Sequence, residues 1–481
     1  MHFSVISRVT GILLMLFSLA LFSPVLIALL YAESTIPTFA LASAITFATG
    51  LVLVLFARSR RELRSGDGFL ITVLFYVGLG LFGAIPFTLA ESVNATFTDA
   101  AFESLSGLTT TGATVLTGLD DLPKSILFYR QMLQWLGGMG IIVLAVAILP
   151  MLGIGGMQLY RAEAPGPVKD NKLTPRITET AKALWYLYLG LTAACAAAYY
   201  LAGMSLFDAV CHAFSTVAIG GFSTHDASIG YFASPAVEAV AIAFMIVSGI
   251  NFGLHFMVLN RKRPLLYAQD MEVRLYLLVL VAVAAIVTWL LTQYPGTSEH
   301  PIREGIFQAV SIATTTGYTT SNFSLWPSVA PVLLLFAAFA GGCAGSTAGG
   351  IKMVRVLLIY LQGMREIRRL IHPQGIFPVK LGRNRVPGRV LEAVWGFFSV
   401  YVIIFLTMVS LLMLISELDF ITAFSAVGAC LNNLGPGLGA VAENYASLSA
   451  EVKWTLTAAM LLGRLEIFTL LVLLTPAFWR R

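Results

Sequence analysis

Charged residues are scarce in this sequence of 481 residues. They make up 11% of the chain, whereas hydrophobic residues make up 58%, and the mean hydropathy is +0.84. Soluble domains carry about 25% charged residues, so this shortage excludes an ordinary soluble fold. Runs of about 20 apolar residues recur, each long enough to cross a bilayer as a helix. The composition therefore predicts an all-α polytopic membrane protein.

Cysteine and histidine are also few, and neither forms a cluster. The four cysteines have no CxxC spacing, and the six histidines form no HExxH or similar group. This pattern excludes a disulfide framework or zinc site, and a membrane-embedded enzyme would need such residues grouped within the spans. No GxGxxG motif opens a βαβ unit. We expect no enzyme, no organic cofactor on this chain and no nucleic-acid partner.

The apolar segments that are present follow a repeating order. Two spans come first, at residues 10–32 and 36–57, and the first is too long for the apolar core of a signal peptide, so we expect a retained helix. A unit of span, half-length helix, glycine-bearing loop and span then recurs four times. The units comprise 69–89, 97–108 and 132–152; 181–202, 206–216 and 236–259; 273–291, 302–314 and 328–361; and 390–415, 420–431 and 452–479.

The half-length helices predict re-entrant segments. About a dozen residues rise roughly 18 Å, too little to span a hydrocarbon core of about 30 Å. Such a helix must end in protein or water at mid-membrane, where its carboxyl end favours a cation. We expect two N-terminal transmembrane helices at residues 1–66 and four pore repeats around one pore, at 67–176, 177–270, 271–388 and 389–481.

The four loops that follow the half-length helices are the candidate ion site. Gly112, Gly220, Gly317 and Gly435 are expected to adopt backbone conformations that a Cβ disfavours, so that backbone carbonyls form rings of ligands for a dehydrated ion. The loops contain no Asp or Glu, which argues against a filter for divalent cations. The candidate ligands are Thr110, Thr111, Gly112, Ala218, Ile219, Gly220, Thr315, Thr316, Gly317, Asn433, Leu434 and Gly435.

One such loop by itself has a simpler interpretation. A single Thr-Thr-Thr-Gly run is typical of a helix end, with glycine just past the last turn. Four loops at equivalent places between paired spans favour the walls of one pore.

A glycine-rich stretch interrupts the third unit and is a candidate gate. Residues 341–350 hold five glycines, which disfavour a continuous helix. Arg464 and Glu466 lie within the last apolar span, where charges are costly and mark functional candidates. Arg464 has the alternative role of bracing buried carbonyls, and Lys352 the alternative of extending to the cytoplasm. The candidate gate residues are Gly341, Gly342, Gly345, Gly349, Gly350, Lys352 and Arg464.

The distribution of charge predicts the topology. With both termini cytoplasmic, 25 of the 30 Lys and Arg fall on the inner side and 15 of the 25 Asp and Glu on the outer side. The outer acidic excess concentrates cations at the pore mouth. The basic inner loops express this topology, attract anionic lipid or dock a cytoplasmic subunit.

Several motifs resemble the Trk/Ktr/HKT superfamily of potassium-translocating subunits over essentially the whole chain, and its TrkH branch in particular because two spans precede the first repeat. They are residues 102–114 (FESLSGLTTTGAT), 134–140 (QWLGGMG), 160–163 (YRAE), 165–167 (PGP), 220–224 (GGFST) and 430–437 (CLNNLGPG). The resemblance implies potassium uptake across a bacterial inner membrane with potassium as the substrate, a gating loop at 341–350 and a pore-facing Arg464. It also implies a homodimer and a cytoplasmic TrkA-type ring that binds the nucleotide.

Two loops depart from the family pattern. Ala218 and Ile219 stand where the first and third loops have paired threonines, and Asn433 and Leu434 precede the fourth glycine. We therefore expect weaker selection of potassium over sodium than in a channel of four identical loops. A potassium/sodium or potassium/proton coupled transporter of the same superfamily is the alternative. A carrier built on inverted repeats is disfavoured because all four units run in the same sense.

Overall fold

The computed structural model describes residues 3–57, 65–143, 173–327, 329–382 and 384–480. Within them the chain is mostly helical, and two short strands, β1 (Lys380–Leu381) and β2 (Asn384–Arg385), form an antiparallel hairpin. Six helical segments are long and apolar enough to cross a membrane, or up to eight if each of two sharply bent helix pairs counts as one span. The prediction of a polytopic helical membrane protein is confirmed.

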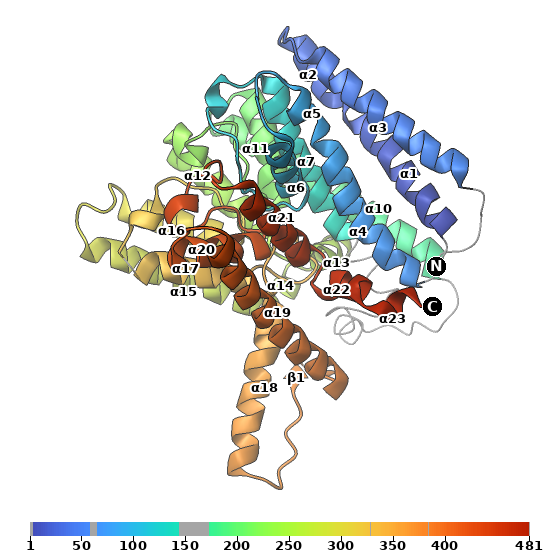
Figure 1. The fold of residues 1–481 in the computed structure, drawn as a ribbon. Helices are drawn as coiled ribbons and strands as arrows, with labels where there is room; N and C mark the ends of the chain where they lie inside the picture. The colour runs from blue at the N-terminus through green and yellow to red at the C-terminus, as the bar shows by residue number, and fades with distance from the viewer. Residues whose placement is uncertain (1–2, 58–64, 144–172, 328, 383, 481) are drawn as a thin grey trace.

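The N-terminal helices form a pair at one side of the molecule (Figure 1). They are α1 (Phe3–Ala20), its continuation α2 (Phe22–Leu30) and the antiparallel α3 (Ile36–Phe56). Gly11 and Gly50 face each other, and a Cβ on either would come within 2.7 Å of the other's carbonyl oxygen. Small residues of this kind let two membrane helices approach closely.

The four repeats follow in order. The first contains α4 (Ser65–Gly83), α5 (Ile85–Leu89), α6 (Phe97–Leu108) and α7 (Lys124–Val143). The second contains α10 (Leu173–Leu201), α11 (Leu206–Ala218), α12 (Pro235–Ser248), α13 (Phe252–Arg261) and α14 (Leu265–Gln269). The third contains α15 (Met271–Gln293), α16 (Pro301–Ala313), α17 (Val329–Ala340) and α18 (Met353–Ile371). The fourth contains α19 (Gly388–Ile415), α20 (Phe420–Leu431), α21 (Ala450–Arg464), α22 (Phe468–Leu474) and α23 (Pro476–Trp479).

The half-length helices α6, α11, α16 and α20 are confirmed as separate helices of 12 or 13 residues. Three of them begin with a side-chain cap, in which Thr96, Ser205 and Asp419 accept hydrogen bonds from the backbone N–H groups of the first turn. The remaining half-length helix, α16, has no side-chain cap and begins with Pro301 instead. Their carboxyl ends are buried and converge, as the expected re-entrant helices require.

Two spans that hydropathy predicts to be continuous are broken. The span expected at 236–259 bends by 91° between α12 and α13, and the span expected at 452–479 bends by 114° between α21 and α22. At the first break Asn251 caps α13 by accepting from Gly253 N at 2.7 Å. At the second, Glu466 and Ile467 adopt positive φ angles of 55° and 41°. These predictions were wrong because the average hydropathy of a segment says nothing of such local bonds.

The break expected in the third repeat is confirmed, since residues 341–352 separate α17 from α18. Beyond it, α18 and α19 project from the body as an arm that carries the β1–β2 hairpin (Figure 1). The motifs at 160–163 and 165–167, and the end of the span expected at 132–152, lie outside the described residues.

Candidate functional site

The four half-length helices end in the same way, which aligns the four loops residue by residue. At each end one backbone N–H bonds, at 2.8 Å, to the carbonyl five residues earlier; these bonds are Thr111 to Ser106, Gly220 to Ser215, Thr316 to Ser311 and Leu434 to Ala429. The residue before each of these donors is left-handed: Thr110, Ile219, Thr315 and Asn433 have φ angles of 51°, 54°, 66° and 53°. The residue after each donor is a glycine at positive φ, and these are Gly112, Gly221, Gly317 and Gly435.

This alignment corrects the sequence prediction in the second loop. Gly220 was expected to match Gly112, Gly317 and Gly435, but the glycine with positive φ is Gly221. The reason is that α11 runs to Ala218, so the left-handed turn falls on Ile219 and the two glycines shift by one position. Ile219 and Gly220 therefore stand opposite the paired threonines, and the second loop still offers no hydroxyl there.

The four aligned glycines close the loops into a ring. A Cβ on Gly112 would overlap the carbonyl oxygen of Gly220 in the second loop, and one on Gly221 would overlap that of Thr316 in the third. A Cβ on Gly317 would overlap the carbonyl oxygen of Leu434 in the fourth loop. The ring closes where a Cβ on Gly435 would lie 2.8 Å from the carbonyl oxygen of Thr111. At each of these contacts the nearest atom is a backbone carbonyl oxygen of the next loop, and a side chain at any of the four glycine positions would push that loop away.

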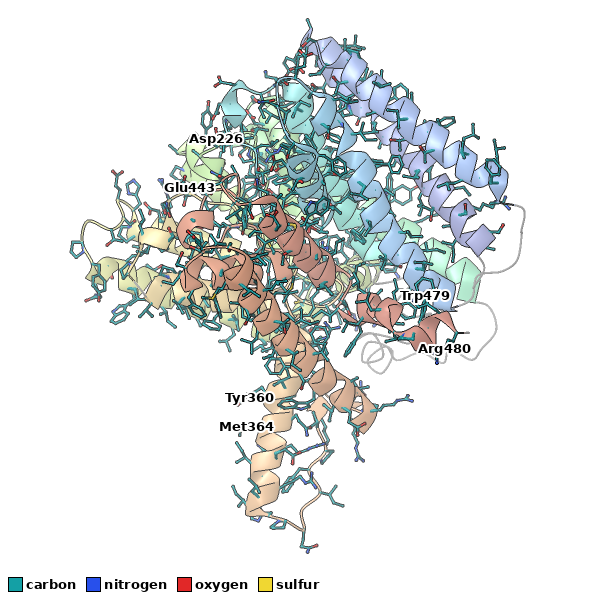
Figure 2. All side chains as sticks on the ribbon, viewed as in Figure 1. Asp226, Tyr360, Met364, Glu443, Trp479 and Arg480 are labelled. Atoms are coloured by element: carbon teal, nitrogen blue, oxygen red, sulfur yellow. The ribbon has the colours of Figure 1, made fainter. Side chains whose placement is uncertain are left out.

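On one side of the ring lies a cavity of about 490 Å³, called here the vestibule. Gly112, Gly221, Gly317 and Gly435 all line it, together with residues of the segments that follow each loop. Asp226 and Glu443 are among its wall residues, and Figure 2 shows them near each other at the end of the molecule opposite the arm. The vestibule thus reaches the ring from the side on which the sequence places the acidic excess.

A buried ion pair supports the first two loops from behind. Arg130 of α7 pairs with Glu103 of α6 at 2.8 Å and also donates to the Ser223 carbonyl at 2.9 Å. Glu103 in turn accepts from the backbone N–H of Val115 at 2.9 Å. Because Glu103 balances the guanidinium, Arg130 holds the loops without leaving an uncompensated positive charge beside the vestibule. Neither residue was predicted from the sequence to support the loops.

A histidine with two carboxylate neighbours lies in the vestibule wall. His225 bonds through Nδ1 to Asp120, lies 3.6 Å from Asp208 through Nε2, and stacks on the Tyr231 ring at a centroid distance of 3.4 Å. Burial alone would lower the pKa of His225, but hydrogen bonding and attraction to Asp208 and Asp120 outweigh it and raise the pKa above its usual value. The imidazole therefore keeps its proton to a higher pH than a free histidine does.

On the opposite side of the ring lies the glycine-rich segment 341–350. Thr347 Oγ1 donates to the Val217 carbonyl of the second repeat at 3.0 Å. Gly349 N donates to Thr315 Oγ1 of the third repeat at 2.7 Å, and Gly350 N donates to the Asn432 carbonyl of the fourth at 3.0 Å. The segment therefore bonds directly to three of the four helix ends.

Arg464 completes the contact with the first repeat. Its Nη2 atom donates to Thr110 Oγ1 at 2.6 Å and to the Thr347 carbonyl at 3.0 Å, so one guanidinium joins the first loop to the glycine-rich segment. The bond to Thr347 agrees with the interpretation in which Arg464 braces a buried carbonyl. Lys352 does not extend away but donates from Nζ to the Ala348 carbonyl within the segment.

Glycine is required in this segment for close approach. A Cβ on Gly349 would overlap the Asn432 carbonyl oxygen, and one on Gly341 would overlap that of Gly349. Gly341, Gly345 and Gly350 also have positive φ angles. A cavity of only about 50 Å³ remains here, lined in part by Gly349, Gly350, Lys352, Arg464 and Glu466.

Two side-chain anchors hold the segment, and sequence reasoning missed both sets of contacts. Glu272 of α15 accepts from Ala344 N at 2.7 Å and from Val354 N at 3.0 Å. Arg355 of α18 pairs with Glu466 at 2.6 Å. Glu466 thus bonds across the structure rather than to Arg464. No pattern in the sequence links Glu272 to a segment some 70 positions later.

The comparisons agree with this architecture. The family model TrkH, described as a cation transport protein, matches residues 35–481. The chain is 54% identical to the Trk system potassium uptake protein TrkH of Salmonella typhimurium and 55% identical to that of Halomonas elongata, each over 100% of both chains. It is also similar to the crystal structure of the potassium transporter TrkH from Vibrio parahaemolyticus, with a TM-score of 0.93, 50% identity and full coverage of both chains.

Proposed function

Because the chain belongs to the TrkH family of cation transport proteins, we propose that it carries potassium ions into the cell through the ring of four loops. The observation that carries this proposal is the closed ring itself, in which four helix ends with the same hydrogen bonds meet at glycine backbones that line the vestibule. The relatives named above are potassium transporters by name.

Backbone carbonyls supply most of the ion ligands in this proposal. The hydroxyls of Thr111 and Thr316 are hydrogen-bonded within their own loops, to Thr109 and Thr314, and the second and fourth loops have none at that position. The aligned ligands of the second loop are Ile219, Gly220 and Gly221, with Ala218 one residue earlier. Unequal loops of this kind support a modest preference for potassium over sodium.

The segment 341–350 and Arg464 act as the gate. Their hydrogen bonds to all four repeats hold the inner side of the ring closed, and an ion passes only when they are displaced. A membrane potential of about 100 mV, negative inside, gives roughly 2.3 kcal/mol per charge and about fiftyfold accumulation. Uptake through the open path therefore needs no coupling ion, which favours a channel-like path over a symporter.

The protein works at the bacterial inner membrane, with both termini and the arm on the cytoplasmic side and the repeats beginning at residues 67, 177, 271 and 389. The arm carries exposed Arg368, Arg369 and Tyr360, which suit contact with a second copy of the chain and with a cytoplasmic TrkA-type ring. Regulation by nucleotide then enters through that partner.

Growth of a bacterium that lacks its own potassium uptake systems tests this function. Expressed with its cytoplasmic partner, the chain should restore growth on limiting potassium, without a requirement for external sodium or a proton gradient beyond the membrane potential. Transport of another solute without transport of potassium would refute the proposal. A strict sodium requirement would favour the coupled symporter.

A further inference from the structure

The second loop lacks a bond that the first and third loops share. In the first loop the hydroxyls of Thr109 and Thr111 lie 2.7 Å apart, and in the third those of Thr314 and Thr316 lie 2.8 Å apart. Each bond ties the helix end to the residue before the ring glycine. The aligned residues of the second loop are Ala218 and Gly220, which have no hydroxyl. Its backbone must therefore be held in another way.

Gln134 of α7 supplies that support from the first repeat. Its Nε2 atom donates to the Gly220 carbonyl at 2.6 Å, and its Oε1 atom accepts from Phe222 N at 3.1 Å. The side chain is fully buried. The carboxamide thus bonds to the carbonyl of the residue before Gly221 and to the N–H group of the residue after it. A two-point bridge fixes orientation as well as position.

Gln134 and Gly220 are also matched in shape. The three atoms nearest to a Cβ built on Gly220 all belong to the carboxamide of Gln134. Gly220 does not have a positive φ, so its backbone conformation would accept a threonine, as the aligned Thr111 and Thr316 show. Gly220 is glycine because the carboxamide takes the space that a threonine side chain fills in the other two loops.

We propose that Gln134, a residue outside the four loops, is a positioning residue that replaces the missing threonine of the second loop and helps to set the cation selectivity of the ring. This inference rests on the proposed potassium transport through the ring. A carbonyl oxygen has two lone pairs, so the Gly220 carbonyl can accept from Gln134 and still face an ion. The direction of the Gly220 carbonyl is then set by a donor 86 residues away in sequence.

Gln134 lies where the first and second loops meet. The Gly220 carbonyl oxygen that it binds is the atom that a Cβ on Gly112 would overlap, and Gln134 Nε2 itself lies 3.6 Å from that Cβ position. A displaced Gly220 carbonyl would therefore disturb both the second wall of the ring and its contact with the first. This position gives one buried amide an influence on two of the four walls.

The experiment compares four variants of the full-length chain, expressed with the cytoplasmic partner in a strain that lacks other potassium uptake. The variants are Gln134→Met, Gly220→Thr, the double variant Q134A/G220T, and Gln131→Met as a matched control. Gln131 is buried on the same helix, and its side chain makes no hydrogen bond among the described residues. The measurements are the potassium/sodium uptake ratio, the amount of protein in the membrane and its thermal stability.

Gln134→Met removes both bonds and should lower the potassium/sodium ratio about threefold to tenfold, whereas Gln131→Met should leave it unchanged. Gly220→Thr places a side chain against the carboxamide and should lower the ratio as well. The double variant restores the arrangement of the first and third loops and should recover the ratio to within about twofold of the unmodified chain. A merely structural role for Gln134 would change protein amount and stability without this recovery.

Two results would overturn the inference: an unchanged ratio in Gln134→Met, or a double variant no more selective than the worse single variant. If Gln134→Met does not reach the membrane, the double variant alone tests the inference. A double variant that is more selective than Gly220→Thr supports the inference, and one that is not contradicts it. If the unmodified chain does not transport potassium, the proposed function fails instead. The two failures are therefore distinguishable.

Discussion

The two sides of the ring differ sharply in space and in bonding. The vestibule side has a cavity of about 490 Å³, whereas the opposite side leaves about 50 Å³. The vestibule wall includes the carboxylates of Asp226 and Glu443, and its Arg130 is paired with Glu103. Lys352, Arg464 and the Arg355–Glu466 ion pair line the smaller cavity. Under the proposed function, an ion gathers at the ring from the vestibule side, and the hydrogen bonds of residues 341–350 and Arg464 close its exit on the other side. In that proposal the glycine-rich segment controls the flux and the vestibule controls the supply of ions to the ring.

Shortening the closed side should have the largest effect. Deleting residues 344–348 removes Thr347 and the Ala348 carbonyl, and with them the bonds to Val217, Lys352 and Arg464. We expect uptake of rubidium or potassium to rise by roughly tenfold or more, because a population held closed by a few bonds shifts to open. A deletion of equal length at 295–299, in the exposed connection between α15 and α16, should leave uptake unchanged. Lower flux in a well-folded deletion variant would contradict a gating role.

Changing the ring itself should alter selectivity rather than flux control. Gly317→Ser forces a Cβ toward the Leu434 carbonyl and onto a positive φ of 84°. We expect the potassium/sodium uptake ratio to fall by about tenfold, with a normal amount of protein in the membrane. Gly363→Ser is the control, because a Cβ there meets nothing within 4 Å. An unaffected ratio in Gly317→Ser would remove the third loop from the filter.

Replacing the guanidinium beneath the ring should have an intermediate effect. Arg464→Ala breaks the bridge between Thr110 and Thr347 and removes a positive charge from the ion path. We expect uptake to rise by about fivefold, and Arg464→Lys to rise less because it keeps the charge but not the fixed spacing of the guanidinium nitrogens. Initial uptake rates at equal protein amount provide the measurement. A fall in uptake with unchanged stability would make Arg464 part of the conduction path rather than of the gate.

Protonation of His225 in the vestibule wall should have the smallest effect on uptake. Because the pKa of His225 is raised, its positive charge persists above the ordinary histidine pKa of about 6.5 and is lost as pH rises further. The protonated form repels cations, so uptake should fall by about twofold on acidification through this range. The variant His225→Asn should lose this pH dependence of uptake. The variant His372→Asn, at an exposed histidine of the arm, is the control and should keep it. An equal pH profile in both variants would place the titrating group elsewhere.

Periodicity and composition were sufficient to predict the repeats. The bounds 97–108 and 420–431 agree with α6 and α20 residue for residue, because a polar loop after a short apolar run leaves little choice of helix end. The break at 341–352 was also predictable, because the five glycines of this stretch disfavour a helix whatever the rest of the protein does.

Other features depend on bonds between repeats and were therefore hidden. The adjacent Gly220 and Gly221 allow two alignments, and the hydrogen bond from Gly220 N to Ser215 together with the positive φ of Gly221 decides between them. The break at 249–251 coincides with a bond from Cys343 N to the Gly249 carbonyl, nearly a hundred residues away. Gln134 belongs to a recognisable motif, yet its role follows only from its contact with a loop of the next repeat.

The closure of the ring between its fourth and first walls has a consequence for synthesis of the protein. Asn433 Nδ2 donates to Thr111 Oγ1 at 2.9 Å, across a separation of 322 residues. At translation rates of about 5–20 residues per second, the first wall waits on the order of tens of seconds for its partner. A nascent chain inserted up to its third repeat lacks one of the four walls, so the ring cannot close. Under the proposed function, completion of the last repeat is the step at which a membrane-inserted polypeptide becomes a selective pathway, and truncation before residue 435 should leave none.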